Sequence, residues 1–420
     1  MKKSLFILIL LLLNSLCTFA EDSVTLYDNA DFKELVLNDV QHIDNNKTYK
    51  KELFETFSEP QGQNLFENSN SLTSQTKIFS GISQAAKDIY NLQVDQISSP
   101  QPLLSDYLTK KFDEGPVESV HTWGVFQSNF DTTMTEGEHG ITRFNPALVN
   151  VLIDTKMRGG KDNFRLMLDM SHQHNRSFMS QFVQDAYYET KRIPHHTILI
   201  GNSRTGTGYE GAQSPYTLPF INRSQISRNL ANIRKVGVRV KGDYSLVDYD
   251  FGGYSSDTFF TEFIPGLEFD GWVNLKPFGK TDGRYGKLTT GTGFVLGRRN
   301  SVDYSLGGAY IGYEYKRFWT RMEYAISDGS NGGSGLTDKR RQGWYVTIGY
   351  RLTKKIEVLA RYDEFDPDRG VKANNQREYT AGVNYYLKGQ ALKLIFNYIY
   401  CQNEAKPDSH RLLVGTQIAL

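Results

Sequence analysis

The stretch EYTAGVNYYLKGQALKLIFNYIY, residues 378–400, decides the fold class of this chain. Its side chains alternate in polarity, so that Tyr379 and Val383 share one face while Glu378 and Thr380 share the other. The alternation resumes over residues 391–400. A period of two is typical of β-strands with one apolar and one polar face. The stretch therefore predicts two consecutive strands.

The same alternation recurs from about residue 118 to the end of the chain, for example in 163–171 and 411–420. Several runs are about ten residues long, which is the length of a tilted membrane strand. Many apolar faces end in Tyr, Phe or Trp, as interfacial girdles do. A soluble sandwich also alternates, but these features favour a transmembrane antiparallel β-barrel. We predict an all-β fold with about 16 strands and longer connections at 205–232, 253–266 and 327–342.

Composition excludes other classes. The 420 residues include 25 Tyr, 25 Phe and 37 Gly but only 2 Cys, so a disulfide scaffold is excluded. Mean hydropathy is −0.48. Beyond the first 20 residues, no apolar run reaches the ~20 residues that a membrane-spanning helix needs.

Residues 1–20 have the features of a secretory signal peptide. Lys2 and Lys3 precede an uncharged apolar run, and Thr18 and Ala20 are the small residues that a signal peptidase site needs. We expect export, cleavage near Ala20, and location in the outer membrane of a Gram-negative-type bacterium.

Charge divides the remaining chain near residue 115. Residues 21–115 carry 16 acidic residues, 8 Lys and no Arg, whereas 116–420 carry 31 acidic and 38 basic residues. Such asymmetry indicates a domain boundary. We expect an acidic periplasmic extension or linker at 21–115 and the barrel domain at 116–420.

Several segments resemble the phosphate-selective porin O and P family. They are 185–187, 199–201, Glu210, the run Leu218-Pro-Phe-Ile-Asn-Arg-Ser224, and the closing segment 411–420. The resemblance covers about residues 118–420. It implies a 16-stranded, trimeric, anion-conducting porin.

In such a protein, lumen-facing charge sets selectivity, because a basic wall concentrates anions. Strand parity places a set of cations inward, since a cation on the lipid face costs ~2–4 kcal/mol at mid-membrane. This candidate anion pathway comprises Arg165, Lys235, Arg239, Lys241, Arg317, Arg321, Arg351, Arg361 and Lys393.

Two alternatives stay open for these cations. Each one could instead pair with an inward Asp or Glu such as Asp169, Glu323 or Asp363, which would give an ordinary charged wall. Arg223 and Arg228 lie in the long connection at 205–232. That connection either folds into the barrel as a constriction loop or stays on the surface.

Other functions have weaker support. The pairs His172/His174 and His195/His196 lack the spacing and partners of a metal site, and no cofactor or nucleic-acid motif is present. A barrel hydrolase is disfavoured because Ser171 and His172 are sequential neighbours on opposite faces. A third hypothesis is a structural anchor whose region 21–115 binds the cell wall or a partner. The expected partners of a porin are small anions such as phosphate, outer-membrane lipids, and copies of itself in a homotrimer.

Overall fold

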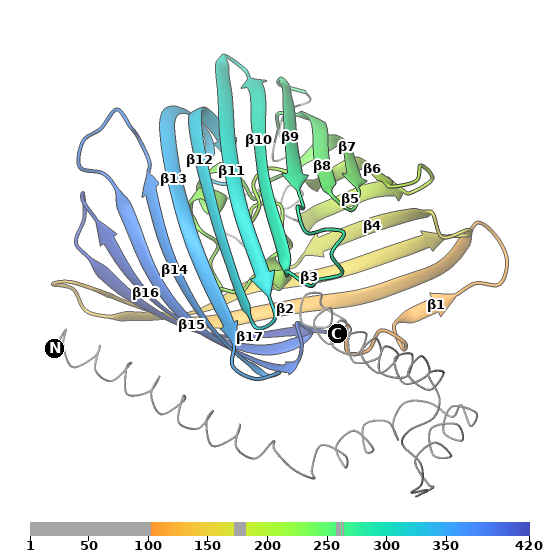
Figure 1. Cartoon of the computed structure of the whole chain (residues 1–420), viewed down its shortest axis with the longest axis horizontal. Helices are drawn as coiled ribbons and strands as arrows, with labels where there is room; N and C mark the ends of the chain where they lie inside the picture. The colour runs from red at the N-terminus through yellow and green to blue at the C-terminus, as the bar shows by residue number, and fades with distance from the viewer. Residues whose placement is uncertain (1–101, 172–181, 258–261, 263) are drawn as a thin grey trace, which may run out of the picture. The chain divides into compact units, whose positions relative to one another are not determined.

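The structure, a computed structural model, describes residues 102–171, 182–257, 262 and 264–420. These residues belong to the second of the two units into which the chain divides, 89–420. Sixteen of its strands form one closed antiparallel barrel, in which each strand pairs with the next and β17 pairs with β2. Figure 1 shows these strands side by side in chain order around the barrel. The predicted 16-stranded barrel is confirmed.

The barrel strands are β2 Val117–Thr135, β3 Ile141–Met157, β4 Asp162–Asp169, β5 Val183–Thr190, β6 His196–Arg204, β7 Arg234–Asp243, β8 Val247–Ser255, β9 Leu267–Leu275, β10 Lys287–Arg299, β11 Val302–Tyr315, β12 Phe318–Gly332, β13 Gly335–Arg351, β14 Ile356–Asp366, β15 Gln376–Lys388, β16 Leu392–Asn403 and β17 Ser409–Ala419. A short additional strand, β1 Thr109–Lys111, pairs with β2. Residues 109–111 of the predicted extension therefore join the sheet. The remainder of that extension up to residue 101, and the signal peptide, lie outside the described residues.

Alternation along each strand separates an outer from an inner face. In β12, Phe318 and Met322 are 40% and 43% exposed on the outside, whereas Trp319 and Glu323 are 6% and 3% exposed on the inside. The same parity holds in β16, where Phe396 is exposed and Lys393 is buried. A shift of one residue would exchange the faces, so this pattern fixes the register.

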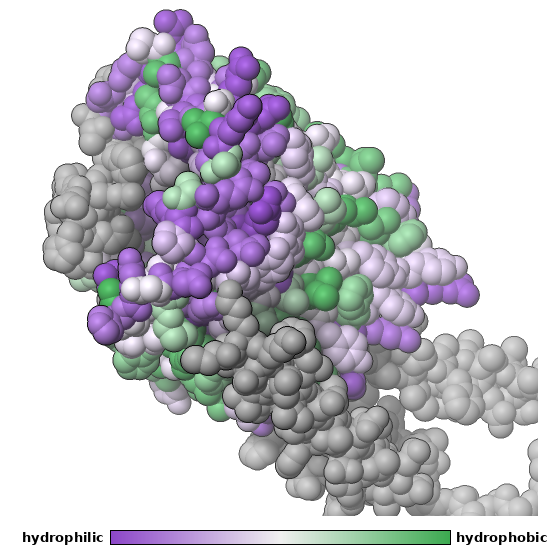
Figure 2. Space-filling model, turned by 90° about the vertical axis from the view of Figure 1, so that its left-hand side faces the viewer, coloured by the Kyte–Doolittle hydropathy of each residue, from purple (hydrophilic) through white to green (hydrophobic). Residues whose placement is uncertain are grey.

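The outer surface carries a large set of exposed apolar side chains. It includes Phe164, Ile200, Val236, Phe251, Phe269, Phe294, Ile311, Met322, Ile348, Tyr379, Phe396 and Leu412. In the view of Figure 2, hydrophobic residues line the right-hand flank, whereas hydrophilic residues gather toward the top. An extended apolar outer surface is what a barrel needs against lipid. None of the helices among the described residues is long and apolar enough to cross a membrane.

The longest connection between described strands runs from residue 205 to 233, and we call it the lumen loop. It contains a 3-10 turn, η1 Pro215–Thr217, and one helix, α6 Gln225–Leu230. The Ser224 side chain accepts a hydrogen bond from the Ser227 N–H at the start of α6, which satisfies one of the free donors of a helix N-terminus. Ile226 and Leu230 of α6 pack in one buried cluster with Tyr345 and Phe365. This cluster seats the helix on the inner face of the barrel.

The prediction of a loop at 327–342 is wrong. β12 extends to Gly332 and β13 begins at Gly335, so this stretch is a long hairpin with a short tip. Its glycines have another role, since a Cβ on Gly332 would lie 2.5 Å from the carbonyl oxygen of Asn229 in α6. The glycine-rich sequence allows the hairpin backbone to approach the helix.

Candidate functional site

The lumen loop folds into the barrel rather than lying on its surface. α6 contacts β12, β13 and β14 from the inside. Further polar contacts of the loop reach β9, β15, β16 and β17. The loop begins at the end of β6 and crosses to the opposite side of the barrel, where it contacts β14–β17.

Backbone N–H groups of the lumen loop donate to carboxylates on the inner wall. The Gly206 N–H donates to Asp270 of β9 at 3.1 Å. The Tyr209 N–H donates to Glu323 of β12 at 2.8 Å. In the same way, the Gln225 N–H donates to Asp363 of β14 at 2.7 Å. Buried backbone N–H groups need such acceptors, so these three hydrogen bonds hold the loop against the inner wall.

Backbone carbonyl groups of the loop accept from inner-wall cations and amides. The donors and acceptors are Asn384 Nδ2 to Pro219 O at 2.8 Å, Lys393 Nζ to Leu218 O at 3.0 Å, Gln417 Nε2 to Tyr216 O at 3.0 Å and Arg361 Nη1 to Asn222 O at 3.1 Å. Buried backbone groups need such partners, because an unpaired one loses its hydration without replacement. Side chains of β14–β17 thus replace water along residues 216–222.

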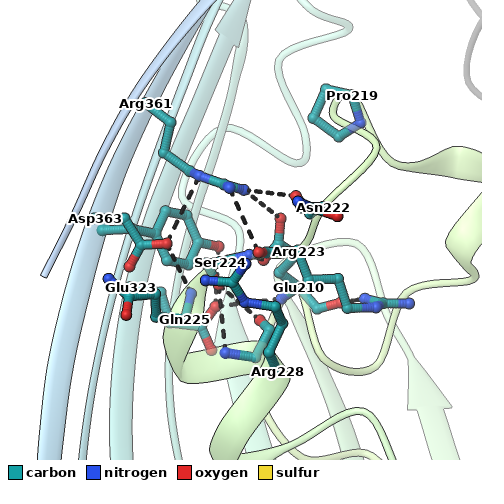
Figure 3. A network of polar contacts seen from close by, with 12 residues as sticks. Glu210, Pro219, Asn222, Arg223, Ser224, Gln225, Arg228, Glu323, Arg361 and Asp363 are labelled. Atoms are coloured by element: carbon teal, nitrogen blue, oxygen red, sulfur yellow. Dashed lines mark hydrogen bonds and ion pairs between the residues drawn. The ribbon is translucent and has the colours of Figure 1, made fainter. Parts of the chain in front are cut away.

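Arg361 is the centre of this docking. Its guanidinium lies 3.5 Å from a Glu210 carboxylate oxygen and 3.8 Å from an Asp363 oxygen, and its side chain is fully buried. Figure 3 shows it reaching from β14 toward Asn222 and Arg223 of the loop. It also stacks on the Phe220 ring at 4.8 Å.

Glu210 links two parts of the loop. Its carboxylate accepts the Ser224 N–H at 2.7 Å. Burial of this carboxyl group favours its protonated form, but Arg361 and Arg223 outweigh burial and lower the pKa of Glu210 below its ordinary value. The carboxylate is therefore kept charged at neutral pH. Its negative charge balances part of the charge of the two arginines.

Arg223 and Arg228, the two arginines that the sequence places in this connection, both form hydrogen bonds. Arg223 donates to the carbonyl oxygens of Glu210 and, at 2.6 Å, of Gln213, so it braces the loop internally. Arg228 donates to Glu378 of β15 at 2.7 Å. Both residues lie in the lumen loop inside the barrel, and both have hydrogen-bond partners there.

Most of the candidate wall cations form ion pairs. Arg165 pairs with Asp154 at 2.6 Å, and Arg351 pairs with Glu357 at 3.5 Å. The other two pairs are Lys235 with Glu268 and Arg239 with Asp250. Pairing of these cations with inward carboxylates is the alternative that the sequence left open.

Arg317 and Arg321 form no such ion pair. Arg317 lies in the exposed turn between β11 and β12, where it donates to the Leu352 carbonyl, so its placement within an inward strand face is wrong. Arg321 does lie on the inner face of β12. It stacks on Trp319 at 4.7 Å and on Tyr209 of the loop at 5.2 Å, and no described carboxylate lies within 4.0 Å of it.

Opposite the docked side, the loop leaves a pocket against β4–β7, with a volume of ≈ 250 Å³. Lys241 lines it and has no ion pair with a described carboxylate. The pocket also contains two arginines, Arg204 and Arg234, that the strand-parity argument missed. They occupy the ends of β6 and β7 beside the loop, and only the inward path of the loop turns those strand ends into part of an enclosed site.

No group of three or more His, Cys, Asp or Glu side chains among the described residues is placed to hold a metal ion. His195 lies in the turn before β6, and His196 is the first residue of β6, where its ring contacts the Tyr249 hydroxyl at 2.6 Å. His172 and His174 lie outside the described residues.

The closed 16-stranded barrel with an inward loop defines a porin-type fold. Residues 282–418 match the model of a family described as phosphate-selective porin O and P, which confirms the resemblance found in the sequence. The match includes β17 up to Ile418, whereas the other resembling segments, 185–224, precede it.

Solved structures share the fold at low identity. The outer membrane channel DcaP of Acinetobacter baumannii is 10% identical with a TM-score of 0.54, over 74% of this chain and 99% of that one. OmpT of Vibrio cholerae, in a trimer form, is 11% identical with a TM-score of 0.50, over 72% and 99%. OmpF of Salmonella typhi, in complex with daunomycin, is 10% identical with a TM-score of 0.52, over 73% and 99%.

No curated protein matches the chain. The family match and the barrel together support an outer-membrane channel.

Proposed function

We propose that this protein is an outer-membrane diffusion channel that prefers small anions, and that it has no enzymatic activity. The observation that carries the proposal is Lys241, an inward cation that lines the pocket beside the loop and has no described carboxylate within 4.0 Å. Carboxylates on the inner wall are largely committed to the loop backbone or to other cations. Unpaired cations in a narrow, water-filled lumen raise the local concentration of anions.

The route we propose for solutes runs between the lumen loop and the inner faces of β4–β7. The opposite side is closed by the hydrogen bonds that hold the loop. The candidates Arg165, Lys235, Arg239, Arg351, Arg361 and Lys393 then act chiefly by shaping the lumen, because their charges are paired or buried.

Assembly and export complete the proposal. A homotrimer is supported by the trimer form of the structurally similar OmpT. Residues 1–20 are proposed as a signal peptide cleaved near Ala20, and the part of 21–115 that precedes β1 as a periplasmic extension that contacts the cell wall. Phosphate is one small anion compatible with arginine's planar, bidentate geometry.

The test is the reversal potential of the purified full-length protein in a planar bilayer under a potassium chloride gradient. We expect a potential of the sign that chloride permeation gives. Lys241→Gln should move it toward zero, whereas Arg298→Gln, at an exposed residue on β10, should leave it unchanged. A cation-selective wild-type channel, or folded and heat-modifiable protein that forms no channel, would overturn the proposal.

A further inference from the structure

The two ends of the barrel differ in charge. At the end where β17 terminates, seven turns connect consecutive strands, from the β3–β4 turn to the β15–β16 turn. Together these turns hold 11 Lys and Arg residues and one acidic residue, Asp282. The connections at the other end, apart from the lumen loop, hold 4 Lys and Arg residues and 7 acidic residues. We call the first end the basic rim.

Two neighbouring turns of the basic rim bring four cations together. The β11–β12 turn consists of Lys316 and Arg317, and the β13–β14 turn includes Lys354 and Lys355. The Arg317 guanidinium donates to the Leu352 carbonyl oxygen at 3.2 Å, which joins the two turns. Figure 1 shows the strands that carry them, β11–β14, side by side. All four cationic side chains are exposed.

None of these four cations has a described carboxylate within 4.0 Å. The nearby acidic residues point into the barrel. Glu314 lies opposite the inward residue Trp319 in the β11–β12 pairing, so it shares the inner face. Glu357 is buried and pairs with Arg351 at 3.5 Å. The four positive charges therefore lack a counter-charge from the described part of the chain.

A row of aromatic rings lies directly beside these cations. Tyr315, Phe318 and Tyr350 are opposite one another in register across β11, β12 and β13. Phe318 and Tyr350 are 40% and 43% exposed on the outer face, and Lys316 Nζ lies 5.0 Å from the centre of the Tyr315 ring. Aromatic side chains of membrane barrels gather where the lipid headgroups lie. The row therefore places the four cations at the depth of the headgroups.

The backbone at Lys316 indicates that a cation at this position has a role. Lys316 has a φ of 53°, in a two-residue hairpin turn. Glycine or asparagine is the usual residue in such a conformation, because a Cβ makes it less favourable. A residue held in an unfavourable backbone conformation points to a function of its side chain.

The partner that fits this arrangement is the headgroup of an anionic phospholipid. Its phosphate oxygens accept charge-assisted hydrogen bonds from Lys and Arg, while its acyl chains lie along the apolar outer surface below the aromatic row. Lys and Arg residues near an anionic leaflet are attracted to it. The cations of the basic rim also lie in turns from β3 to β14, as contact with surrounding lipid requires. A soluble acidic partner would need no aromatic row at this level.

We propose that the turns of β11–β14 bind anionic phospholipid headgroups, and that the phosphate is contacted by Lys316, Arg317, Lys354 and Lys355. We call these four residues and the aromatic row the headgroup site. Binding forms and breaks no covalent bond. The site requires that the barrel lies in a bilayer, but it does not depend on the anion preference of the lumen.

Native mass spectrometry of the purified full-length protein in detergent tests the site. The probes are phosphatidylglycerol, whose headgroup has a net negative charge, and phosphatidylcholine with the same acyl chains, whose ammonium group cancels the phosphate charge. We expect the dissociation constant for phosphatidylglycerol to be about tenfold lower, because several cations contribute to binding of the anionic lipid. Equal dissociation constants for the two lipids would overturn the inference.

A fourfold variant locates the binding. The combination of Lys316→Gln, Arg317→Gln, Lys354→Gln and Lys355→Gln should raise the dissociation constant for phosphatidylglycerol about tenfold and remove the preference. The matched control removes the same charge from exposed residues at the other end, through Arg143→Gln, Arg369→Gln, Lys372→Gln and Lys406→Gln. This control should bind phosphatidylglycerol as the wild type does. Equal weakening in both variants would mean that only overall charge matters, which would contradict the proposed site.

A competitor distinguishes a lipid from free phosphate. Soluble glycerol 3-phosphate has the phosphate group without acyl chains, so at the concentration of the lipid it should displace little phosphatidylglycerol. Full displacement would show that the site binds a phosphate group alone and would overturn the assignment to lipid. Heat-modifiable migration identifies the folded variants, and the comparison of the two lipids on the wild type does not depend on them.

Discussion

Two sides of the lumen use the same residue types for opposite purposes. We call the inner faces of β9 and β12–β17 the docked wall, because their polar side chains form hydrogen bonds with the lumen loop. Asp270, Glu323 and Asp363 accept hydrogen bonds from its N–H groups. Arg361 and Lys393 donate hydrogen bonds to its carbonyl oxygens. The inner faces of β4–β7, which we call the open wall, face a pocket. There Arg204 and Lys241 have no described acidic partner.

The difference shows that inward charge is not the same as available charge. Lys393 is fully buried and donates to Leu218 O and Gln390, so it presents nothing to a solute. Lys241 lies on the same kind of inward strand face but lines the pocket. Whether a cation can select anions depends on which wall the loop leaves uncovered.

The largest effect is expected when the docked wall loses Arg361. Arg361→Met leaves Glu210 and Asp363 without their shared cation and frees the carbonyl groups of Asn222 and Arg223. Breaking a buried ion pair from one side costs about 3–5 kcal/mol, so the loop should detach in part. We expect larger, noisier single-channel conductance and weaker selectivity.

Arg351→Met is the matched control for this change. Arg351 pairs with Glu357 at the barrel rim and has no hydrogen bond to the loop among the described residues. Its loss should leave conductance close to wild type. Equal conductance of the Arg361→Met and wild-type channels would show that the loop does not depend on this cation.

The second-largest effect is expected when the sign of a charge on the open wall is reversed. Lys241→Glu changes the pocket by two charge units, and one unit at about 4 Å in water corresponds to ~1 kcal/mol, or about a fivefold change in local ion concentration. The reversal potential should therefore move toward cation preference while unit conductance changes little. Arg298→Glu, on an exposed side chain, serves as the control; equal shifts in both variants would mean that only overall charge matters.

The sequence could predict the barrel but only part of the site. Alternation is a local property, so the faces of β12 and β16 follow from parity alone, and Phe318, Met322 and Phe396 lie outside as expected. Pairing is not local: Asp363 lies 138 positions from its loop partner Gln225, and Gln417 lies 201 positions from Tyr216. No periodicity shows which inward charges the loop will neutralise.

Two predictions from the sequence, the loop at 327–342 and the inward position of Arg317, are wrong for the same physical reason. Gly332 and Gly333 predict a loop by composition, yet they let a hairpin approach α6. Arg317 has the same parity as the inward residue Trp319. However, it lies in the turn just before β12 begins, where parity no longer decides the direction of a side chain. Both misplacements depend on where a strand begins or ends, which tertiary packing decides.

A smaller effect is expected on acidification of the docked wall. The pKa of Glu210 lies below its ordinary value of 4.5, so its stabilising charge is fully present above that value and is lost as pH falls through the lowered pKa. The loop should loosen only in strongly acidic solution, seen as a rise in conductance. Glu210→Gln, which cannot titrate, should lose this component of the pH dependence; a variant that retains the full rise would assign it to another group.

The smallest effect is expected for Lys393, a buried cation of the docked wall. Lys393→Met keeps the side-chain volume but removes a buried charge that has no carboxylate within 4.0 Å among the described residues. The loss of two hydrogen bonds, to Leu218 and Gln390, opposes the gain from not burying a charge. We therefore expect a change in unfolding free energy within about 1 kcal/mol and no change in reversal potential. A shift as large as that of Lys241→Gln would mean that solutes sense charges behind the docked loop, and the division of the lumen into two walls would then fail as an account of selectivity.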